Sequence, residues 1–339
     1  VLRDSVERDE LSIVPESKKR EVLAFIGAGL RDFSVSRSLS RARGWGVPVP
    51  DDPDQVVFVW FDALAGYLSA LRWPDADSPW LHAKERAQVI GKGILRFHAV
   101  YWPAILASAG IELPNSLRVH GYLTLDGKKI GKSLGNAVDP QSLVERHGAE
   151  ALRWYLLRHA HSSKDSDFSL SRFDRAHDGE LADQLGNLCS RVETLIARFA
   201  GGRLPQSGAW GPAEERLIES GRRTTSGLAR AFTDFALHDA AAQALELVGA
   251  TNRYLDETAP WRLARESSPR LDGVLYAAAE GLRWSAALLA PLLPLTSRRI
   301  AERLGVGSAP LAREWGQGAP GSTGALGPPR FPRSGPRVS

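Results

Sequence analysis

Three short runs of apolar, strand-forming residues in the first part of the chain constrain its fold more than any other feature. They are Gln55–Phe61, Ala87–Ile90 and Leu117–Leu125. The first run is nearly continuous in β-formers, which is typical of a strand buried on both faces. Segments with helical character follow two of the runs, over Asp62–Leu71 and Ile94–Ala109. Because strands and helices alternate, the sequence predicts a parallel α/β sheet.

Segments rich in glycine and lysine follow two of these runs. Gly91-Lys92-Gly93 comes directly after the second run, and residues 127–136 (GKKIGKSLGN, the lysine loop) follow the third. Glycines let a backbone approach a ligand closely, and lysines suit a polyphosphate. Because ligands of parallel sheets bind at the carboxyl ends of the strands, both segments are candidates for a nucleotide site. Without this context, the lysine loop could be an exposed hairpin turn, and it lacks the spacing of a Walker loop.

Helical periodicity dominates the second part of the chain. Two short helices are expected over Pro140–Ala160, a polar connection with a short extended piece over 161–172, and helices from Phe173 onward. The first long helix carries an apolar stripe of Leu181, Leu185, Leu188, Val192, Leu195, Ile196 and Phe199. Further helices are expected at about 213–235, 238–257, 261–266, 270–290 and 295–304. Together they predict an α-helical bundle.

The composition excludes several classes of protein. With a single cysteine, Cys189, the chain holds neither a disulfide framework nor a cysteine zinc site. No apolar run reaches the roughly 18 residues of a membrane span, and residues 1–20 are too polar for a signal peptide. We therefore expect an intracellular protein. A net charge of +4 permits nucleic-acid binding without favouring it.

An ordered series of segments resembles the methionyl-tRNA synthetase family of class I. The segments are VPES with EVLAFI, FSVSR, GWGVPVP, VWFDALAGY, VIGKGILRFHAVYWP, HGYLTLDGKKIGKSLGN, LGNLCSR and DETAPW, spread over roughly residues 14–300. The lysine loop resembles the KMSKS element of that class, as Lys129-Ile130-Gly131-Lys132-Ser133. It departs from the usual residues at Ile130 and Gly131.

The resemblance implies an α/β plus all-α fold. We expect the C-terminal half of a Rossmann-type parallel nucleotide-binding fold, then a linker subdomain and an α-helical anticodon-binding bundle. The expected boundaries are 1–136 for the partial catalytic domain that ends in the KMSKS-like loop, 137–172 for a stem-contact linker, 173–312 for the bundle and 313–339 for a disordered tail rich in Gly and Pro.

The family's HIGH element and zinc-knuckle insertion are absent, and both would belong upstream of Val1. The chain also contains no Met. Two explanations stay open: the sequence is a segment of a longer protein, or its start codon was read as Val.

The activity that the resemblance implies is methionine–tRNA ligation. ATP activates methionine to methionyl-adenylate, and the methionyl group then passes to the 3′ end of tRNA(Met). The implied ligands are ATP with Mg²⁺, methionine and tRNA(Met), with no zinc site in this chain. A cytoplasmic monomer that does not bind membranes is expected.

The resemblance also assigns residues to the ATP site. Catalytic roles fall to Lys129, Lys132 and Arg37, and Lys132 carries most of the charge neutralisation on the departing pyrophosphate. ATP binding falls to Gly91, Gly93, Lys129, Lys132 and Ser133. At Gly93 the family usually has an acidic residue that contacts the ribose hydroxyls, so this position departs from the pattern.

Two further sets of residues match family sites. The methionine pocket would consist of Trp60, Ala63, Leu64, Tyr67, Ile94, His98 and Trp102. His98 and Trp102 are four residues apart on one expected helix, and aromatic walls make favourable contacts with a thioether. Asn187, Arg191 and Trp261 match anticodon-reading residues. Considered alone, each of these residues could equally serve packing or surface polarity.

Two other functions stay open beside the ligase. Gly93, Gly131 and the missing front half would suit a non-catalytic tRNA-binding paralogue. A synthetase-like enzyme that activates an amino acid for small-molecule biosynthesis is the third hypothesis.

Overall fold

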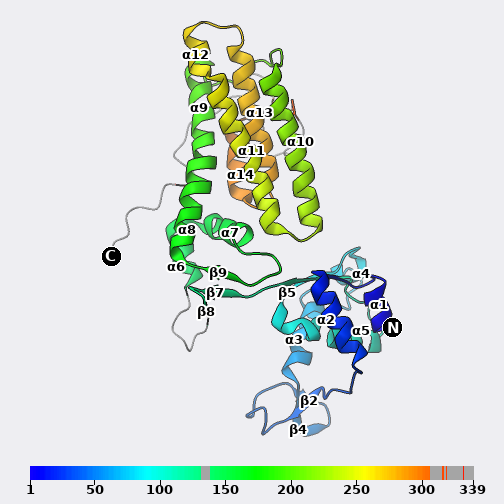
Figure 1. Cartoon of the computed structure of the whole chain (residues 1–339). Helices are drawn as coiled ribbons and strands as arrows, with labels where there is room; N and C mark the ends of the chain where they lie inside the picture. Colours follow the sequence, from blue (N-terminus) through cyan, green and yellow to red (C-terminus); the bar gives the residue numbers. More distant parts are fainter. Residues whose placement is uncertain (131–137, 306–314, 317, 319–330, 332–339) are drawn as a thin grey trace. The chain divides into compact units, whose positions relative to one another are not determined.

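The computed structural model describes residues 1–130, 138–305, 315–316, 318 and 331. The chain forms two compact units, Val1–Tyr122 and Leu123–Ser339 (Figure 1). Each unit has its own hydrophobic core, so the two are described separately.

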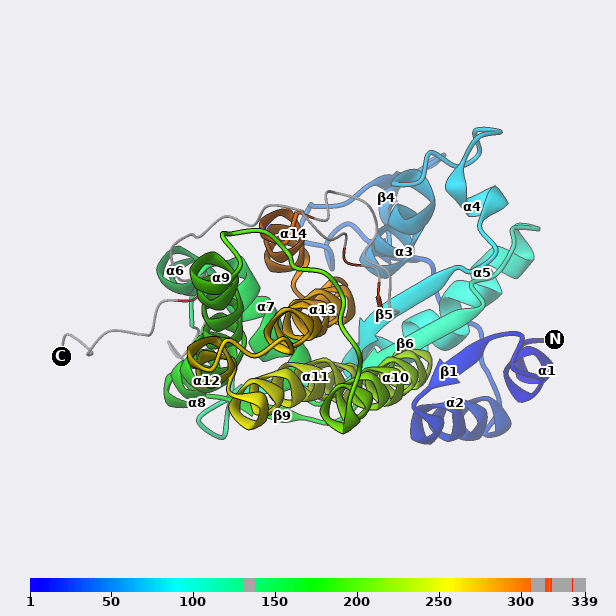
Figure 2. The ribbon, with the colours of Figure 1, turned by 90° about the horizontal axis from the view of Figure 1, so that it is seen from above.

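A three-stranded parallel sheet forms the centre of the first unit. Its order is β1–β6–β5, with bounds β1 (Ser12–Val14), β6 (Ser116–His120) and β5 (Ala87–Gly91). The helices α1 (Leu2–Glu7) and α2 (Glu16–Gly27) accompany β1 (Figure 2). Buried Ile13, Val22 and Leu117 belong to the core between sheet and helices. The expected parallel α/β sheet is therefore confirmed in β5 and β6.

Helical turns of three kinds follow β5 and carry part of the candidate site. They are the 3₁₀ turn η1 (Lys92–Ile94), the π-helical segment η2 (Phe97–Tyr101) and α5 (Trp102–Ser108). The sequence predicted one helix over Ile94–Ala109. The observed segment covers the same residues but widens to π geometry around His98.

The expectation of a buried strand over Gln55–Phe61 is wrong. The strand β4 (Asp52–Val57) lies in a separate antiparallel sheet between β2 (Ser36–Ser38) and β3 (Pro48–Val49), and only its Val56 is buried. From Val59 the same run is helical, in α3 (Val59–Ser69), which the short α4 (Pro79–His82) follows. A short apolar run fits a helix as well as a strand, and here α3 uses it to bury Leu64 and Leu68.

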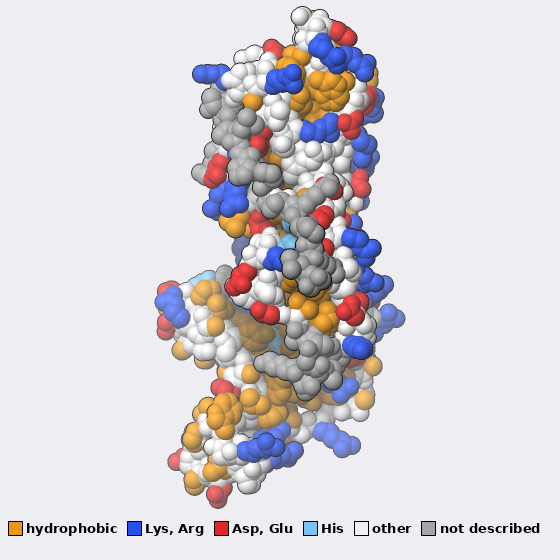
Figure 3. Space-filling view, turned by 90° about the vertical axis from the view of Figure 1, so that its left-hand side faces the viewer, with side chains coloured by type: hydrophobic (Ala, Val, Ile, Leu, Met, Phe, Trp, Pro, Cys, Tyr) orange, Lys and Arg blue, Asp and Glu red, His pale blue; other side chains and the backbone are white. Residues whose placement is uncertain are grey.

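Apolar side chains are exposed around this antiparallel sheet. Val35, Trp45 and Val47 are 47%, 73% and 52% exposed. Figure 3 shows apolar side chains gathered at the lower end of the view, where β2 and β4 lie in Figure 1. This part of the first unit therefore turns much of its apolar surface outward.

The expected strand over Leu117–Leu125 is also wrong, because it is two strands in two sheets. After β6 ends at His120, Gly121 and Tyr122 are not in a strand. The chain then enters β7 (Leu123–Leu125), which pairs antiparallel with β8 (Lys128–Lys129) and parallel with β9 (Ser166–Phe168). Backbone pairing with β9, more than 40 residues away, thus places β7 in the second unit.

The remaining elements described in the second unit are helices, as the sequence predicted. Its helices are α6 (Pro140–His147), α7 (Ala149–Arg158), α8 (Leu170–Ala176), the π-helical η4 (His177–Gly186), α9 (Asn187–Phe199), α10 (Pro212–Thr233), α11 (Leu237–Thr258), α12 (Pro260–Arg265), α13 (Leu271–Leu289) and α14 (Pro294–Arg303). The long helices lie alongside one another (Figure 1). The expected helices after residue 212 are confirmed to within a few residues.

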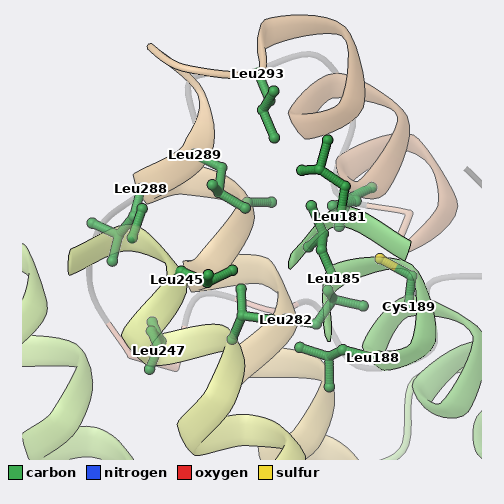
Figure 4. Packing of buried hydrophobic residues seen from close by; sticks show 14 of the residues in the cluster. Leu181, Leu185, Leu188, Cys189, Leu245, Leu247, Leu282, Leu288, Leu289 and Leu293 are labelled. Carbon is green, nitrogen blue, oxygen red and sulfur yellow. The ribbon is translucent and has the colours of Figure 1, made fainter. Parts of the chain in front are cut away.

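The predicted apolar stripe lies in the core of this bundle. Leu181, Leu185 and Leu188 pack with leucines of α11 and α13 (Figure 4). Helix α13 is buried all along Val274–Leu289, including the charged pair Glu280–Arg283 (Arg283 Nε to Glu280 Oε1, 2.7 Å). Two charges survive in such a core because they are paired.

Described residues of the tail contact the bundle. Trp315 packs against Trp284, the Tyr276 hydroxyl donates to the Gly318 carbonyl (3.1 Å), and Phe331 is buried against His177. The expected disorder does not hold for these tail residues. The other residues of 313–339 lie outside the described part of the chain.

Among the described residues, no helix is long and apolar enough to cross a membrane.

We expect Gly221→Ala to destabilise the second unit by about 1–3 kcal/mol through overpacking. A Cβ at Gly221 of α10 would lie 2.5 Å from Cζ3 of Trp284, a side chain that is only 2% exposed. Thermal unfolding followed by circular dichroism measures the loss. Gly179→Ala is the control, because a Cβ there meets no atom within 4 Å. Equal unfolding temperatures for the two variants would contradict the packing argument.

Candidate active site

The carboxyl ends of β5 and β6 meet at one edge of the parallel sheet. Gly91 pairs with His120 in the strand register, and each strand then runs directly into site residues. A Cβ at Gly91 would lie 3.5 Å from Cε1 of His120, which is an ordinary contact. A Cβ at Gly93 would lie only 2.0 Å from the Tyr122 hydroxyl oxygen. The Lys92 ammonium lies 4.8 Å from the centre of the Tyr122 ring.

Tyr67, His98 and Trp102, three of the residues predicted for a methionine pocket, lie close together in the first unit. The Tyr67 hydroxyl lies 3.0 Å from His98 Nε2, and the Tyr67 and Trp102 ring centres are 6.2 Å apart. His98 Nδ1 lies 3.0 Å from the Ile94 carbonyl. Because a carbonyl only accepts, Nδ1 carries the proton and Nε2 accepts from Tyr67. This arrangement is that of a neutral imidazole.

Burial sets the charge state of this cluster. It lowers the pKa of His98 and raises the pKa of Tyr67, since a charged form would lose its hydration. Trp102 is 1% exposed, and its Nε1 has no hydrogen-bond partner within the described residues. The cluster is therefore aromatic and uncharged, with one buried indole donor.

The remaining predicted pocket residues lie in different surroundings. Trp60 is half-buried and stacks on Phe97, with ring centres 4.2 Å apart. Leu64 shares a buried cluster with Trp102, whereas Ala63 is exposed. Ile94 contacts the Tyr67–His98–Trp102 cluster through its backbone carbonyl, which accepts from His98 Nδ1. Phe97, which directly precedes His98 in the chain, was not among the predicted pocket residues, and it provides the ring on which Trp60 stacks.

Arg37 lies in β2, within the antiparallel sheet. Its guanidinium stacks 3.8 Å from the centre of the Phe58 ring and donates from Nη1 to the carbonyls of Ser34 (3.0 Å) and Ser36 (2.7 Å). Phe58 immediately precedes α3, which carries Trp60. No described contact joins Arg37 to His98, so its catalytic role stays a prediction.

A tight hairpin leads into the lysine loop in the second unit. Asp126 and Gly127 connect β7 and β8 with positive φ angles of 49° and 73°, which suits a two-residue Asp-Gly turn. Asp167 Oδ1 accepts hydrogen bonds of 2.6 Å from the Gly127 amide and from the Thr124 hydroxyl. These bonds lower the pKa of Asp167. Asp167 therefore anchors the start of the loop, and sequence reasoning did not identify it.

The described residues include only part of the lysine loop. The Lys129 backbone pairs with Thr124 in β8, but its side chain is not described. Lys132 and Ser133 lie outside the described residues, so their predicted roles stay predictions.

Helix α9 carries Asn187 and Arg191, and α12 carries Trp261. Asn187 is exposed, and Trp261 is 38% exposed. The Arg191 side chain is only 22% exposed, because Nη1 donates to Asn252 Oδ1 (3.1 Å) and Nη2 to Asp256 Oδ1 (2.5 Å) on α11. Asn187 is therefore open to solvent, whereas Arg191 is largely held against α11.

Asp256 and Trp261 belong to the same DETAPW segment. Between them Ala259 adopts a left-handed conformation (φ 43°), where α11 ends and α12 begins. This turn separates the residue that orients Arg191 from the exposed indole. The role of Asp256 was not predicted, although its motif was recognised.

No group of three or more His, Cys, Asp or Glu side chains could hold a metal ion within the described ranges.

Comparison with known proteins identifies two family matches. The model described as "tRNA synthetases class I (M)" matches residues 1–193, and "Anticodon binding domain of methionyl tRNA ligase" matches residues 204–322.

Individual relatives agree with these matches. The methionine–tRNA ligase of Thermosynechococcus vestitus is 41% identical over 300 residues, covering 86% of this chain and 56% of the relative. That of Brucella suis is 37% identical over 306 residues, covering 90% and 59%. A Mycobacterium tuberculosis methionyl-tRNA synthetase bound by methionyl-adenylate superposes with a TM-score of 0.87 at 34% identity, over 98% of this chain and 66% of that one. The chain thus spans little more than half the length of these curated relatives.

We expect Tyr67→Phe to leave the pKa of His98 below the ordinary value of 6.5, because burial lowers this pKa and the substitution keeps the aromatic ring at position 67. In the unchanged protein the pKa should lie below 6.5, with the proton on Nδ1. Imidazole ¹⁵N shifts in an NMR titration measure both. Tyr101→Phe is the control, since its hydroxyl makes no described bond to His98.

The lowered pKa of His98 also makes the stability of the folded protein depend on pH. The unfolded chain protonates His98 more readily, so the contribution is complete above about pH 6.5 and declines as the pH falls toward the lowered pKa of the folded state. A His98 pKa at or above 6.5, in the unchanged protein or in the Tyr67→Phe variant, would contradict this arrangement.

Proposed function

We propose, from the premise that this chain belongs to the methionyl-tRNA synthetase family, that the protein is a methionine–tRNA ligase. The methionine carboxylate attacks the α-phosphate of ATP, which gives methionyl-adenylate and pyrophosphate. A hydroxyl of the terminal tRNA adenosine then takes the methionyl group. The observation that carries the proposal is the neutral Tyr67–His98–Trp102 cluster, on the two segments assigned to the methionine pocket.

The chemistry of this cluster suits a thioether side chain. Methionine is unbranched, polarizable and uncharged, and aromatic rings make favourable contacts with its sulfur. His98 is kept neutral, since Nε2 already accepts from Tyr67 and burial disfavours the imidazolium. A carboxylate or ammonium side chain would enter this pocket without a countercharge. We propose that Trp60, Ala63, Leu64 and Ile94 complete its walls.

The first step needs charge neutralisation and alignment more than covalent help from the protein. We propose that Lys129 and Lys132 neutralise the phosphates, with Arg37 near the reacting groups and Ser133 in the same loop. Asp167 supports this role, because it anchors the hairpin from which the loop starts. Gly91 and Gly93 let the nucleotide approach the end of β5.

Magnesium would enter with ATP. The described residues offer no carboxylate cluster for it, and Mg²⁺ in nucleotide enzymes is held largely by the substrate phosphates. Bound there, it would offset phosphate charge.

The second unit supplies the proposed contacts with tRNA(Met). Unstacked anticodon bases are recognised by stacking on aromatic or guanidinium planes and by hydrogen bonds to their edges. Trp261 offers an exposed indole, Asn187 an exposed amide, and Arg191 a guanidinium that Asp256 and Asn252 hold in place. We propose that these residues read the anticodon. We also propose that the protein is a cytoplasmic monomer, with a stem-contact linker over residues 137–172 and an anticodon-binding bundle over residues 173–312.

A non-catalytic tRNA-binding protein is the second candidate. Gly93 favours it, since the position lacks the acidic residue that is usual in the family. The aromatic cluster favours the ligase, because RNA binding alone gives no reason for a neutral, partly buried Tyr67–His98 pair.

We expect Lys132→Ala to lower methionine-dependent ATP–pyrophosphate exchange by about 100-fold or more, because charge on the departing pyrophosphate is no longer neutralised. Binding of tRNA in a filter assay should survive. The assay uses the native polypeptide, with both ends determined by mass spectrometry. Lys164→Ala is the control, since it removes an exposed lysine of the same unit.

The outcomes separate the candidates. Exchange that needs methionine and Lys132 supports the ligase. Tight tRNA binding without any exchange by the native protein would favour the non-catalytic candidate, and exchange without tRNA charging would favour an enzyme of small-molecule biosynthesis.

We expect Trp261→Ala to weaken binding of tRNA(Met) by about 10-fold, as the loss of one base stack does in other proteins. Trp210→Ala is a matched control, because both indoles are 38% exposed and Trp210 instead packs on Trp315. Filter binding at one fixed salt concentration compares the two. Equal losses would contradict a specific role for Trp261.

A further inference from the structure

Gly93 is not required by its backbone conformation. Gly93 is not one of the glycines with a positive φ angle, and it lies exposed in η1. Its neighbourhood explains the glycine instead. The Tyr122 hydroxyl oxygen lies 2.0 Å from the position of a Cβ at residue 93, and Cζ lies 3.2 Å from it. The Tyr122 hydroxyl thus occupies the space that any side chain at position 93 would need.

Tyr122 is held at this place by its neighbours in the same unit. It follows Gly121 directly after β6, whose His120 pairs with Gly91 at the end of β5. The Lys92 ammonium lies 4.8 Å from the ring centre, within the range of a cation–π contact. The side chain is still 48% exposed. A residue with a polar hydroxyl is therefore placed at the sheet edge where parallel sheets bind ligands, and about half of its surface is exposed.

We propose that Tyr122 is an ATP-binding residue of this protein, and that its hydroxyl contacts the ribose hydroxyls of ATP in place of a side chain at position 93. The proposal rests on the proposed function for the identity of the nucleotide. A phenol is neutral and both donates and accepts, which matches a ribose hydroxyl better than a phosphate. Lysine side chains suit the phosphates of ATP, so we assign the neutral Tyr122 hydroxyl at the sheet edge to the ribose.

The geometry also couples positions 93 and 122. A side chain at residue 93 and the present position of Tyr122 exclude each other. Gly93→Asp must displace the tyrosine, and the new carboxylate then accepts from the ribose. Tyr122 would matter for ATP in the natural protein and lose its effect once residue 93 carries an acid.

Equilibrium binding of ATP, 2′-deoxy-ATP and 3′-deoxy-ATP, measured by calorimetry on the native polypeptide, tests the contact. We expect Tyr122→Phe to raise the Kd for ATP about 3- to 10-fold, as the loss of one hydrogen bond does. The Kd of at least one deoxy analogue should not change, since that analogue already lacks the contacted hydroxyl. Tyr101→Phe, which removes another hydroxyl of the same unit, should leave all three values unchanged.

A second comparison uses the Gly93→Asp background. There Tyr122→Phe should change the Kd for ATP by less than about twofold, because the hydroxyl no longer lies at the ribose. The proposal would be overturned if Tyr122→Phe raised the Kd values for ATP and both analogues equally, or if it left the Kd for ATP unchanged. It would also be overturned if Tyr122→Phe raised the Kd for ATP as much in the Gly93→Asp background as in the natural protein.

Failure of the proposed function gives a different result. ATP binding with the expected hydroxyl dependence, but without methionine-dependent exchange, would overturn the ligase and support the role of Tyr122. A native protein that binds no ATP would overturn both.

Discussion

Parallel pairing of β5 with β6 is the constraint on which the candidate active site depends. The register that sets Gly91 opposite His120 brings the carboxyl ends of both strands to one edge. One strand continues into η1 and the π-helical turn with His98, and the other into Tyr122. Backbone hydrogen bonds thus place the site before any side chain acts. A slip of the register by one residue would turn the side chains to the opposite faces of the sheet.

Burial then determines the chemistry at this edge. His98 has a tyrosine hydroxyl on one ring nitrogen and a carbonyl on the other, so its polar atoms are satisfied while it stays neutral. The rings of Tyr67 and Trp80 both lie beside Trp102, and none of these three side chains adds a charge. The methionine pocket that we propose here would select by shape and polarizability, the properties that distinguish a thioether from most other side chains.

Two carboxylates position candidate functional groups from distant parts of the sequence. Asp167 holds the Gly127 amide across 40 residues, and Asp256 holds Arg191 across 65. Both acids lie in the second unit, and each restricts a group that would otherwise be mobile at a surface. The start of the lysine loop at Gly127 and the guanidinium of Arg191 are therefore positioned by tertiary contacts.

The sequence by itself determined the helical bundle, because periodic leucines such as Leu181, Leu185 and Leu188 leave few other ways to bury an apolar stripe. It also determined the family and the candidate residues, through ordered motifs. Only the tertiary structure decided the strands, since short apolar runs such as Gln55–Phe61 suit a helix as well as a strand and pairing partners lie far away. Only the tertiary structure revealed Asp167, Asp256 and Tyr122, because their significance lies in what they touch. In the sequence, the glycine at position 93 departs from the acidic residue that is usual in the family. In the folded chain, the hydroxyl of Tyr122, which lies just after β6, occupies the space of a side chain at that position.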